Sequence, residues 1–167
     1  MKPDAWNDLY REVILDHYRR PRGENPLSHA DREAEGKNAL CGDDVTLQLQ
    51  LDGECVAGVS CRVRGCSICT ASGSMLAEAV RGKTLQETER LADDVKKLLR
   101  GEGDPEGRAD DLAALSGVRN FPVRVKCALL PWMTLDEALR SLQSGAGGGA
   151  KDEATSTEDP TPKEPKP

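Results

Sequence analysis

The chain has 167 residues, a net charge of −6 from 29 acidic and 23 basic side chains, and only 3% aromatic residues. This acidic balance argues against a nucleic-acid-binding protein, and the scarcity of aromatic rings argues against a surface that stacks on bases. No apolar run approaches the roughly 20 residues that span a bilayer, and the N-terminus lacks the apolar core of a secretory signal peptide, so we expect a cytoplasmic protein without a membrane partner.

The first predicted element is a helix at residues 4–20. Apolar side chains recur there at helical spacing, Asp4 is a suitable N-cap, and Pro21 ends the pattern. Residues 21–40, which follow, are rich in proline, glycine, asparagine and charge, and we predict that they are irregular.

Two strands are predicted next, at residues 45–51 and 55–63. Apolar and polar side chains alternate in both segments, which is typical of half-buried strands, and Asp52-Gly53 between them is a strong hairpin signal. Gly58 indicates a bulge in the second strand.

The remaining regular elements are helices, predicted at residues 67–80, 85–99 and 109–115 and from Pro122 onward. Pro131 is predicted to break the last helix, with Thr134 capping a final turn or two. Residues 144–167 have almost no apolar side chains and are expected to form a disordered tail. Residues 1–143 are therefore predicted to form one α+β domain, a small antiparallel sheet of about three strands packed against several helices.

The chain has six cysteines, which are expected to stay reduced in a cytoplasmic protein. A framework of three disulfides is the weaker interpretation, because it is typical of small secreted domains. Cys55 and Cys61 lie in phase with the apolar face of their strand, so both are predicted to be core residues.

Four other polar groups are candidates for a site. Cys41 and Asp43 flank Gly42 in a loop before a strand, Cys66 directly precedes a helix, and Cys127 lies in the last helix. The free N–H groups at a helix N-terminus favour a thiolate at Cys66. Three thiols and a carboxylate make a complete tetrahedral ligand set for zinc, or a three-thiolate cradle for an iron–sulfur species.

The remaining candidates have ordinary interpretations. Cys66 and Cys69 form a CxxC pair, but no βαβ pattern supports a thioredoxin-like role and no second CxxC completes a zinc knuckle. His17 lies on the apolar face of the first helix and is predicted to be a packing residue, while the role of His29 stays open.

These motifs resemble those of the U-type iron–sulfur assembly proteins, the IscU/SufU family, also described as NifU N-terminal-like. The resemblance rests on the run from Leu9 to Tyr18 followed by Pro21-Arg22, on Cys41-Gly42-Asp43, on Gly65-Cys66-Ser67-Ile68, and on Arg124-Val125-Lys126-Cys127. Lys126, where the scaffold branch has a histidine, and an insertion at roughly residues 96–118 place the chain with the SufU branch.

The resemblance implies a zinc ion held by Cys41, Asp43, Cys66 and Cys127. It also implies a pyridoxal-phosphate-dependent cysteine desulfurase of the SufS type as partner, with Cys41 as sulfur acceptor and a downstream iron–sulfur assembly complex. Arg124 is a candidate for orienting the site or contacting the partner.

Two other functions use the same residues. The chain could be a scaffold on which a transient iron–sulfur cluster is built, because the ligand set serves either role, although Lys126 is a poor cluster ligand at its ordinary pKa. It could also be a structural zinc domain without transfer chemistry.

Overall fold

The computed structural model describes residues 3–105 and 110–143. The elements follow in the order α1 (Pro3–Arg19), β1 (Arg32–Asn38), β2 (Asp43–Asp52), β3 (Cys55–Arg64), α2 (Ser67–Val80), α3 (Leu85–Leu99), the 3-10 helix η2 (Asp111–Asn120) and α4 (Pro122–Gln143). This confirms the predicted α+β fold. The expected tail at 144–167 lies outside the described residues. Among the described helices, none is both long enough and apolar enough to cross a bilayer.

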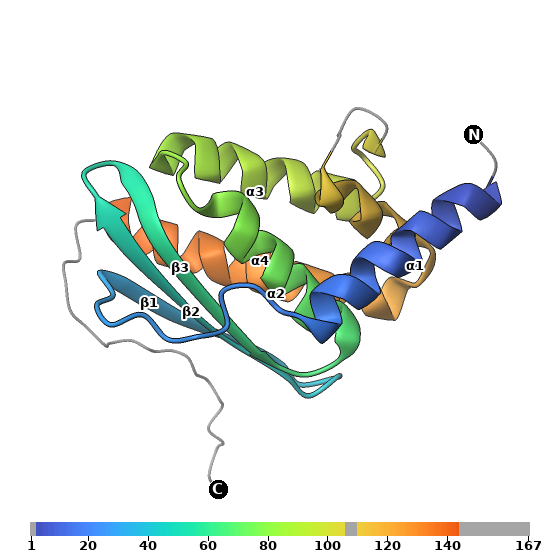
Figure 1. The fold of residues 1–167 in the computed structure, drawn as a ribbon, viewed down its shortest axis with the longest axis horizontal. Helices are drawn as coiled ribbons and strands as arrows, with labels where there is room; N and C mark the ends of the chain where they lie inside the picture. The colour runs from blue at the N-terminus through green and yellow to red at the C-terminus, as the bar shows by residue number, and fades with distance from the viewer. Residues whose placement is uncertain (1–2, 106–109, 144–167) are drawn as a thin grey trace, which may run out of the picture.

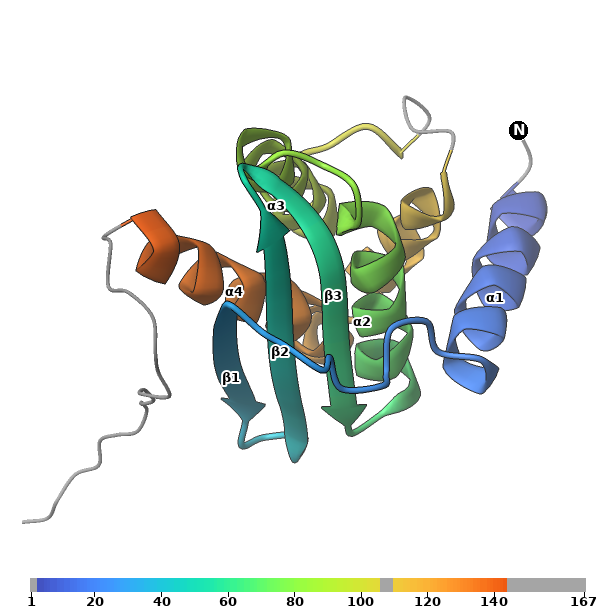
Figure 2. The ribbon, with the colours of Figure 1, turned by 60° about the vertical axis from the view of Figure 1, so that its left-hand side comes forward.

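The three strands form one antiparallel sheet in the order β1-β2-β3. One face of the sheet is covered by helices, with α2 packed on β3 and α4 on β1 and β2, while α1 and α3 pack on this helical layer (Figures 1 and 2). The segment between α1 and β1 crosses the other face beside β3 (Figure 2), where the Gly23 carbonyl accepts from Cys61 N at 2.7 Å.

Strand β1 corrects the prediction that residues 21–40 are wholly irregular. It pairs with β2 from Arg32↔Leu49 to Asn38↔Asp43. The strand is at the edge of the sheet and its side chains are at most half-buried, so charged residues are tolerated at positions where a central strand would need apolar ones.

Cys55 corrects a second prediction, because its side chain is exposed and not in the core. The register pairs Gln50 with Gly58 but Leu51 with Val56, so Ala57 is an extra residue in β3. This bulge lies beside Gly58, where the sequence predicts one. It reverses which side chains face the core in the part of β3 that precedes it. Val56 therefore faces the core, whereas Cys61, beyond the bulge, is buried as predicted.

Helix α4 continues through Pro131, which was predicted to break it. Proline lacks the N–H that would bond the Cys127 carbonyl, and beside this gap Ser72 Oγ donates to the Ala128 carbonyl at 2.7 Å. Thr134 is not a cap, since its hydroxyl donates to the Leu130 carbonyl at 2.8 Å within the helix.

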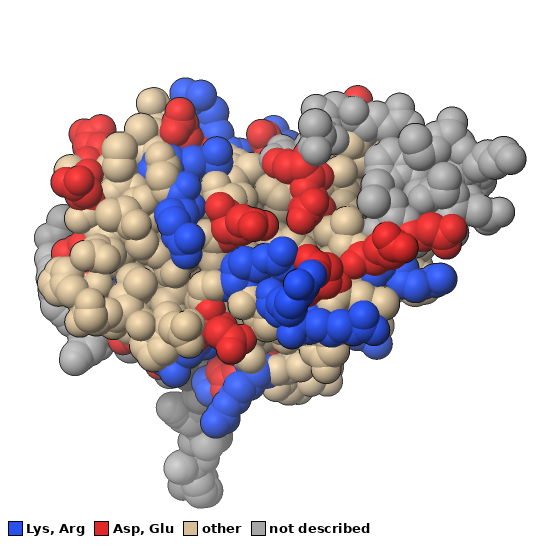
Figure 3. All heavy atoms as spheres, viewed as in Figure 1, with Lys and Arg blue, Asp and Glu red and all other residues tan. Residues whose placement is uncertain are grey.

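The predicted short helix at 109–115 is a 3-10 helix at Asp111–Asn120, and residue 109 lies outside the described residues. The core lies between the sheet and the helical layer and centres on Trp132, which is fully buried. Acidic and basic side chains are interspersed over the face seen in Figure 3, without a large field of one sign.

Candidate metal centre

Cys41 lies in the four-residue turn that joins β1 to β2. Gly42 has a φ of 73°, a left-handed conformation that glycine adopts without steric cost, and its N–H donates to the Asn38 carbonyl at 2.8 Å. The turn leaves Cys41 half-buried beside Leu40, which is 78% exposed. The unpredicted strand β1 is therefore the element that positions the first thiol.

Asp43 is the first residue of β2 and lies in phase with Val45, so its side chain turns into the layer under the helices and is only 2% exposed. Its Oδ1 accepts a hydrogen bond from Cys66 N at 2.9 Å. A Cβ at Gly65 would overlap Oδ1, so the absence of a side chain there allows this close approach. Asp43 Oδ2 remains directed toward the thiols.

Cys66 is the N-cap of α2, as its position before the helix predicted. Its Sγ accepts from Cys69 N at 3.4 Å and lies 4.0 Å from Asp43 Oδ2. The cap places Cys66 Sγ at the positive end of the helix dipole.

Cys127 is fully buried in the second turn of α4, and its Sγ donates to Cys41 Sγ at 3.1 Å. Burial raises the pKa of the Cys127 thiol above its ordinary value, and hydrogen bonds with Cys41, Asp43 and Cys66 raise it further. The pocket therefore resists deprotonation of this thiol unless a cation compensates the charge.

The donor atoms of Cys41, Asp43 and Cys127 lie within 4.8 Å of one another, and Cys66 Sγ adjoins them through Asp43. Ligands about 2.3 Å from a tetrahedral zinc ion are about 3.8 Å apart. The 3.1 Å between Cys41 and Cys127 and the 4.0 Å between Cys66 and Asp43 lie on either side of that separation. Cys41, Asp43 and Cys127 therefore fit a zinc ion, with Cys66 Sγ beside them, and a bound ion would neutralise ligands that otherwise repel one another.

The other sequence candidates lie around this centre. Cys69 is buried, and its pKa is raised by burial first and then by the nearby charges of Asp43 and Cys66. Burial raises the pKa of Cys61 to about 12. Arg124 is exposed in the first turn of α4, and its charge opposes the rise that burial causes in the pKa of Tyr10.

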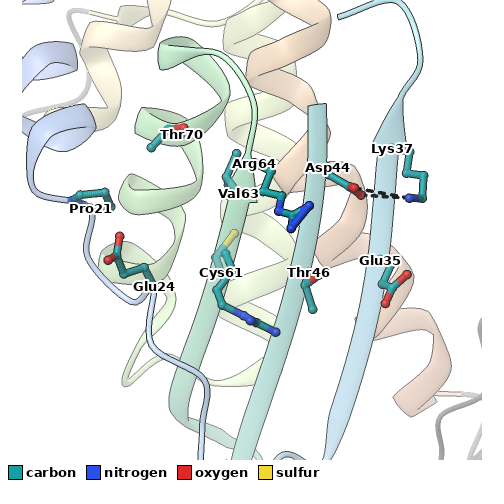
Figure 4. Close-up of a pocket in the computed structure, with 11 residues that line it drawn as sticks. Pro21, Glu24, Glu35, Lys37, Asp44, Thr46, Cys61, Val63, Arg64 and Thr70 are labelled. Carbon is teal, nitrogen blue, oxygen red and sulfur yellow. Dashed lines mark hydrogen bonds and ion pairs between the residues drawn. The ribbon is translucent and has the colours of Figure 1, made fainter. Parts of the chain in front are cut away.

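The open face of the sheet carries a separate hollow of about 580 Å³ (Figure 4). Its charged lining includes Glu35, Arg64 and the cross-strand ion pair between Lys37 and Asp44, at 3.3 Å. None of the four candidate ligands lines it. The candidate ligands therefore lie at the end of the sheet and not on its open face.

Sequence reasoning missed the cluster in which the buried His17 contacts the buried Ser74 and the half-exposed Asp111. His17 is a buried residue, as its helical phase predicted. Its polar partners lie 57 and 94 positions away along the chain. No local signal joins them.

The model of the family described as "NifU-like N terminal domain" matches residues 9–128. The chain is 36% identical over 134 residues to the iron–sulfur cluster assembly scaffold protein IscU of Thermotoga maritima, covering 80% of this chain and 94% of the relative. It is also 36% identical over 138 residues to the zinc-dependent sulfurtransferase SufU of Bacillus subtilis, covering 82% and 93%.

Solved structures have the same fold. A SUF-system iron–sulfur cluster assembly scaffold protein from Fervidobacterium islandicum superposes with a TM-score of 0.73 at 35% identity, over 78% of this chain and 96% of the other. A NifU-like N-terminal protein from Brucella abortus superposes with a TM-score of 0.74 at 27% identity, over 83% and 96%.

Proposed function

We propose that this chain, which belongs to the family of the NifU-like N-terminal domain, is a zinc-dependent sulfurtransferase of iron–sulfur cluster assembly. The observation that carries the proposal is the convergence of Cys41, Asp43 and Cys127 around one point, with Cys66 adjoining them. In this proposal the four residues hold zinc, and a cysteine desulfurase supplies the sulfur. The relative named as a zinc-dependent sulfurtransferase supports this choice of metal and activity.

Zinc, when bound, supplies a redox-inert charge that keeps the thiols deprotonated without oxidising them. The Cys66 N–H holds Asp43 Oδ1 in place, so that Oδ2 stays directed into the site. Cys66 is fixed as a helix cap and Cys127 is buried in a helix, whereas Cys41 is half-buried in a turn. Cys41 is therefore our candidate for the sulfur acceptor.

In the transfer step, the Cys41 thiolate attacks the outer sulfur of the desulfurase persulfide. A new S–S bond forms at Cys41, the persulfide bond on the desulfurase breaks, and its cysteine leaves as a thiolate. The electrons balance without an external oxidant. The product is a Cys41 persulfide that a downstream assembly complex consumes.

A scaffold that builds a nascent cluster is the second candidate, because two of the similar proteins carry that description. Position 126 argues against it. Lys126 is exposed, and a lysine ammonium donates hydrogen bonds but has no lone pair for a metal, so three thiolates and one carboxylate are the donors around the point of convergence.

The test is desulfurase turnover with and without the zinc-loaded protein, in the absence of iron. Strong stimulation and a mass increase of one sulfur on the Cys41 peptide are expected. Cys41→Ser should abolish both while remaining folded, and Cys55→Ser, which changes an exposed cysteine outside the site, should leave both unchanged.

Three outcomes would contradict the proposal. A Cys41→Ser variant that still takes up persulfide would remove Cys41 from its role. Absence of stimulation, with cluster assembly once iron is supplied, would favour the scaffold. A protein that binds zinc but does neither would be a structural zinc domain.

A further inference from the structure

We propose a second metal site, formed by His17, Glu78 and Asp111, that binds a divalent first-row ion through one imidazole nitrogen and two carboxylates. The residues come from α1, α2 and the start of η2, which pack against one another on the side of α2 away from the sheet. None of them belongs to the cysteine cluster. The site is independent of the proposed sulfur transfer.

The geometry of the three donors suits a metal. His17 Nε2 lies 2.9 Å from Asp111 Oδ2 and 3.8 Å from Glu78 Oε1, and all three donor atoms lie within 4.8 Å of one another. Ligands about 2.1 Å from an ion are about 3.0 Å apart at right angles and about 3.4 Å apart at the tetrahedral angle. The 2.9 Å and 3.8 Å separations from His17 Nε2 lie close to these values.

His17 is held in the orientation that a metal ligand requires. The ring is fully buried, and Nδ1 lies 2.7 Å from Ser74 Oγ, which also accepts from Arg22 N at 2.8 Å. When the Nδ1–H group donates a hydrogen bond to Ser74 Oγ, Nε2 is unprotonated and directs its lone pair toward the two carboxylates. Metal-bound histidines are held by this kind of contact at their second nitrogen.

The carboxylates leave the site accessible. Glu78 and Asp111 side chains are 53% and 52% exposed, and both line a hollow of about 340 Å³. A single Nε2–H group can form a good hydrogen bond with only one of the two carboxylates, whereas a bound cation can interact with both. The second oxygen of Glu78 lies 3.8 Å from Arg22 Nε, so its charge is shared with that guanidinium.

A Ser–His–Asp hydrolase is the competing interpretation of this cluster, and burial excludes it. Ser74 is only 1% exposed and its oxygen already accepts a backbone N–H, so no substrate carbonyl can reach it. Imidazole and carboxylate together suit Mn²⁺, Fe²⁺ and Zn²⁺, and three protein ligands leave positions for water.

The test uses Mn²⁺ added to protein already loaded with one equivalent of zinc. Mn²⁺ lies below Zn²⁺ in affinity order and prefers oxygen and nitrogen donors, so it does not displace zinc from thiolates. Loss of the six-line electron paramagnetic resonance signal of free Mn²⁺ measures binding. One saturable equivalent per chain is expected.

Glu78→Gln and Asp111→Asn, both at half-exposed positions, should each lower the Mn²⁺ affinity at least tenfold. Asp94→Asn, an exposed carboxylate on α3 outside the hollow, is the matched control and should bind like wild type. Absence of binding at millimolar Mn²⁺, or equal binding by all three variants, would overturn the site. Neither result depends on the desulfurase assay.

Discussion

Gly65→Ala is expected to damage the metal centre although residue 65 supplies no ligand. A Cβ at this position would overlap Asp43 Oδ1 and lie 2.9 Å from Asp43 Cγ and 3.0 Å from Asp43 Cα. Because the backbone of Asp43 is paired with Asn38 of β1, the Asp43 side chain has to rotate away. The rotation breaks the bond from Cys66 N and withdraws the carboxylate from the thiols.

The size of the expected loss of stability follows from the steric overlap and from the broken hydrogen bond. Overpacking of a close-packed position costs about 1–3 kcal/mol, and a hydrogen bond to a charged group contributes about 1.5–3 kcal/mol. Because the rotation relieves part of the overlap, we expect the free energy of unfolding to fall by about 3 kcal/mol. With a typical urea dependence, the unfolding midpoint should fall by about 1–2 M. Zinc affinity should fall more than tenfold, since a ligand is displaced.

The assay is urea unfolding of the reduced protein with chelator, followed by zinc competition on the folded variants. A double-mutant cycle isolates the cause. In an Asp43→Ala background the overlap with the carboxylate is absent, and only the tight contact with Asp43 Cα remains. In this background Gly65→Ala should lower the free energy of unfolding by less than half as much as it does in the wild-type protein. An equal cost in both backgrounds would refute the reasoning, because the damage would not come from Asp43.

Three further predictions concern thiols and charge. Iodoacetamide should modify the exposed Cys55 of the zinc-loaded protein well before Cys61 and Cys69, which are buried; peptide mass spectrometry checks the order, and early labelling of Cys61 would contradict the described core. Zinc affinity, measured by competition, should decrease as the pH is lowered from 8 to 6, because burial raises the pKa of the Cys127 thiol and zinc binding must release that proton. A zinc affinity that does not change over this pH range would remove Cys127 from the ligand set. Hydrogen bonds from Arg20 and Arg22 lower the pKa of Asp16 from 3.8 to about 2, so its contribution to stability is present above pH 4 and lost as pH falls toward 2. Asp16→Asn should therefore be less stable than wild type at pH 5, with a difference that shrinks below pH 4 in thermal melts.

The sequence was sufficient for elements with a regular apolar period. Strands β2 and β3 and the helices at 67–80 and 85–99 follow such patterns, and the structure has them within two residues at each end. Strand β1 could not be predicted in this way, because an edge strand of charged residues is held by backbone pairing with β2 and not by an apolar face.

The misplaced residues share a tertiary cause. Cys55 was assigned to the core by simple alternation, and the bulge opposite Gln50 and Leu51 reversed its direction. Pro131 was expected to end a helix on local grounds, yet packing against α2 keeps α4 continuous. In both cases a contact with a neighbouring element overrode the local preference.

The candidate ligands could be proposed from residue chemistry, but the reason they meet could not. The meeting depends on Gly65 accommodating Asp43 and on Cys66 donating its backbone N–H to Asp43 Oδ1. Neither contact has a periodic signal. A glycine before a cysteine at a helix start is compatible with many loops, and only the paired strands specify which carboxylate approaches it.

The four candidate ligands are held in place to different degrees, and this difference bears on the proposed transfer. Asp43 is fixed by its pairing with Asn38 of β1 and by the Cys66 N–H, and Cys127 is buried in a helix. Cys41 lies outside any helix or strand, in a turn whose neighbour Leu40 faces solvent. Movement of Cys41 breaks no helical or ladder hydrogen bond, whereas movement of any of the others does. A sulfur acceptor has to reach a partner, so the fold favours Cys41 for that role.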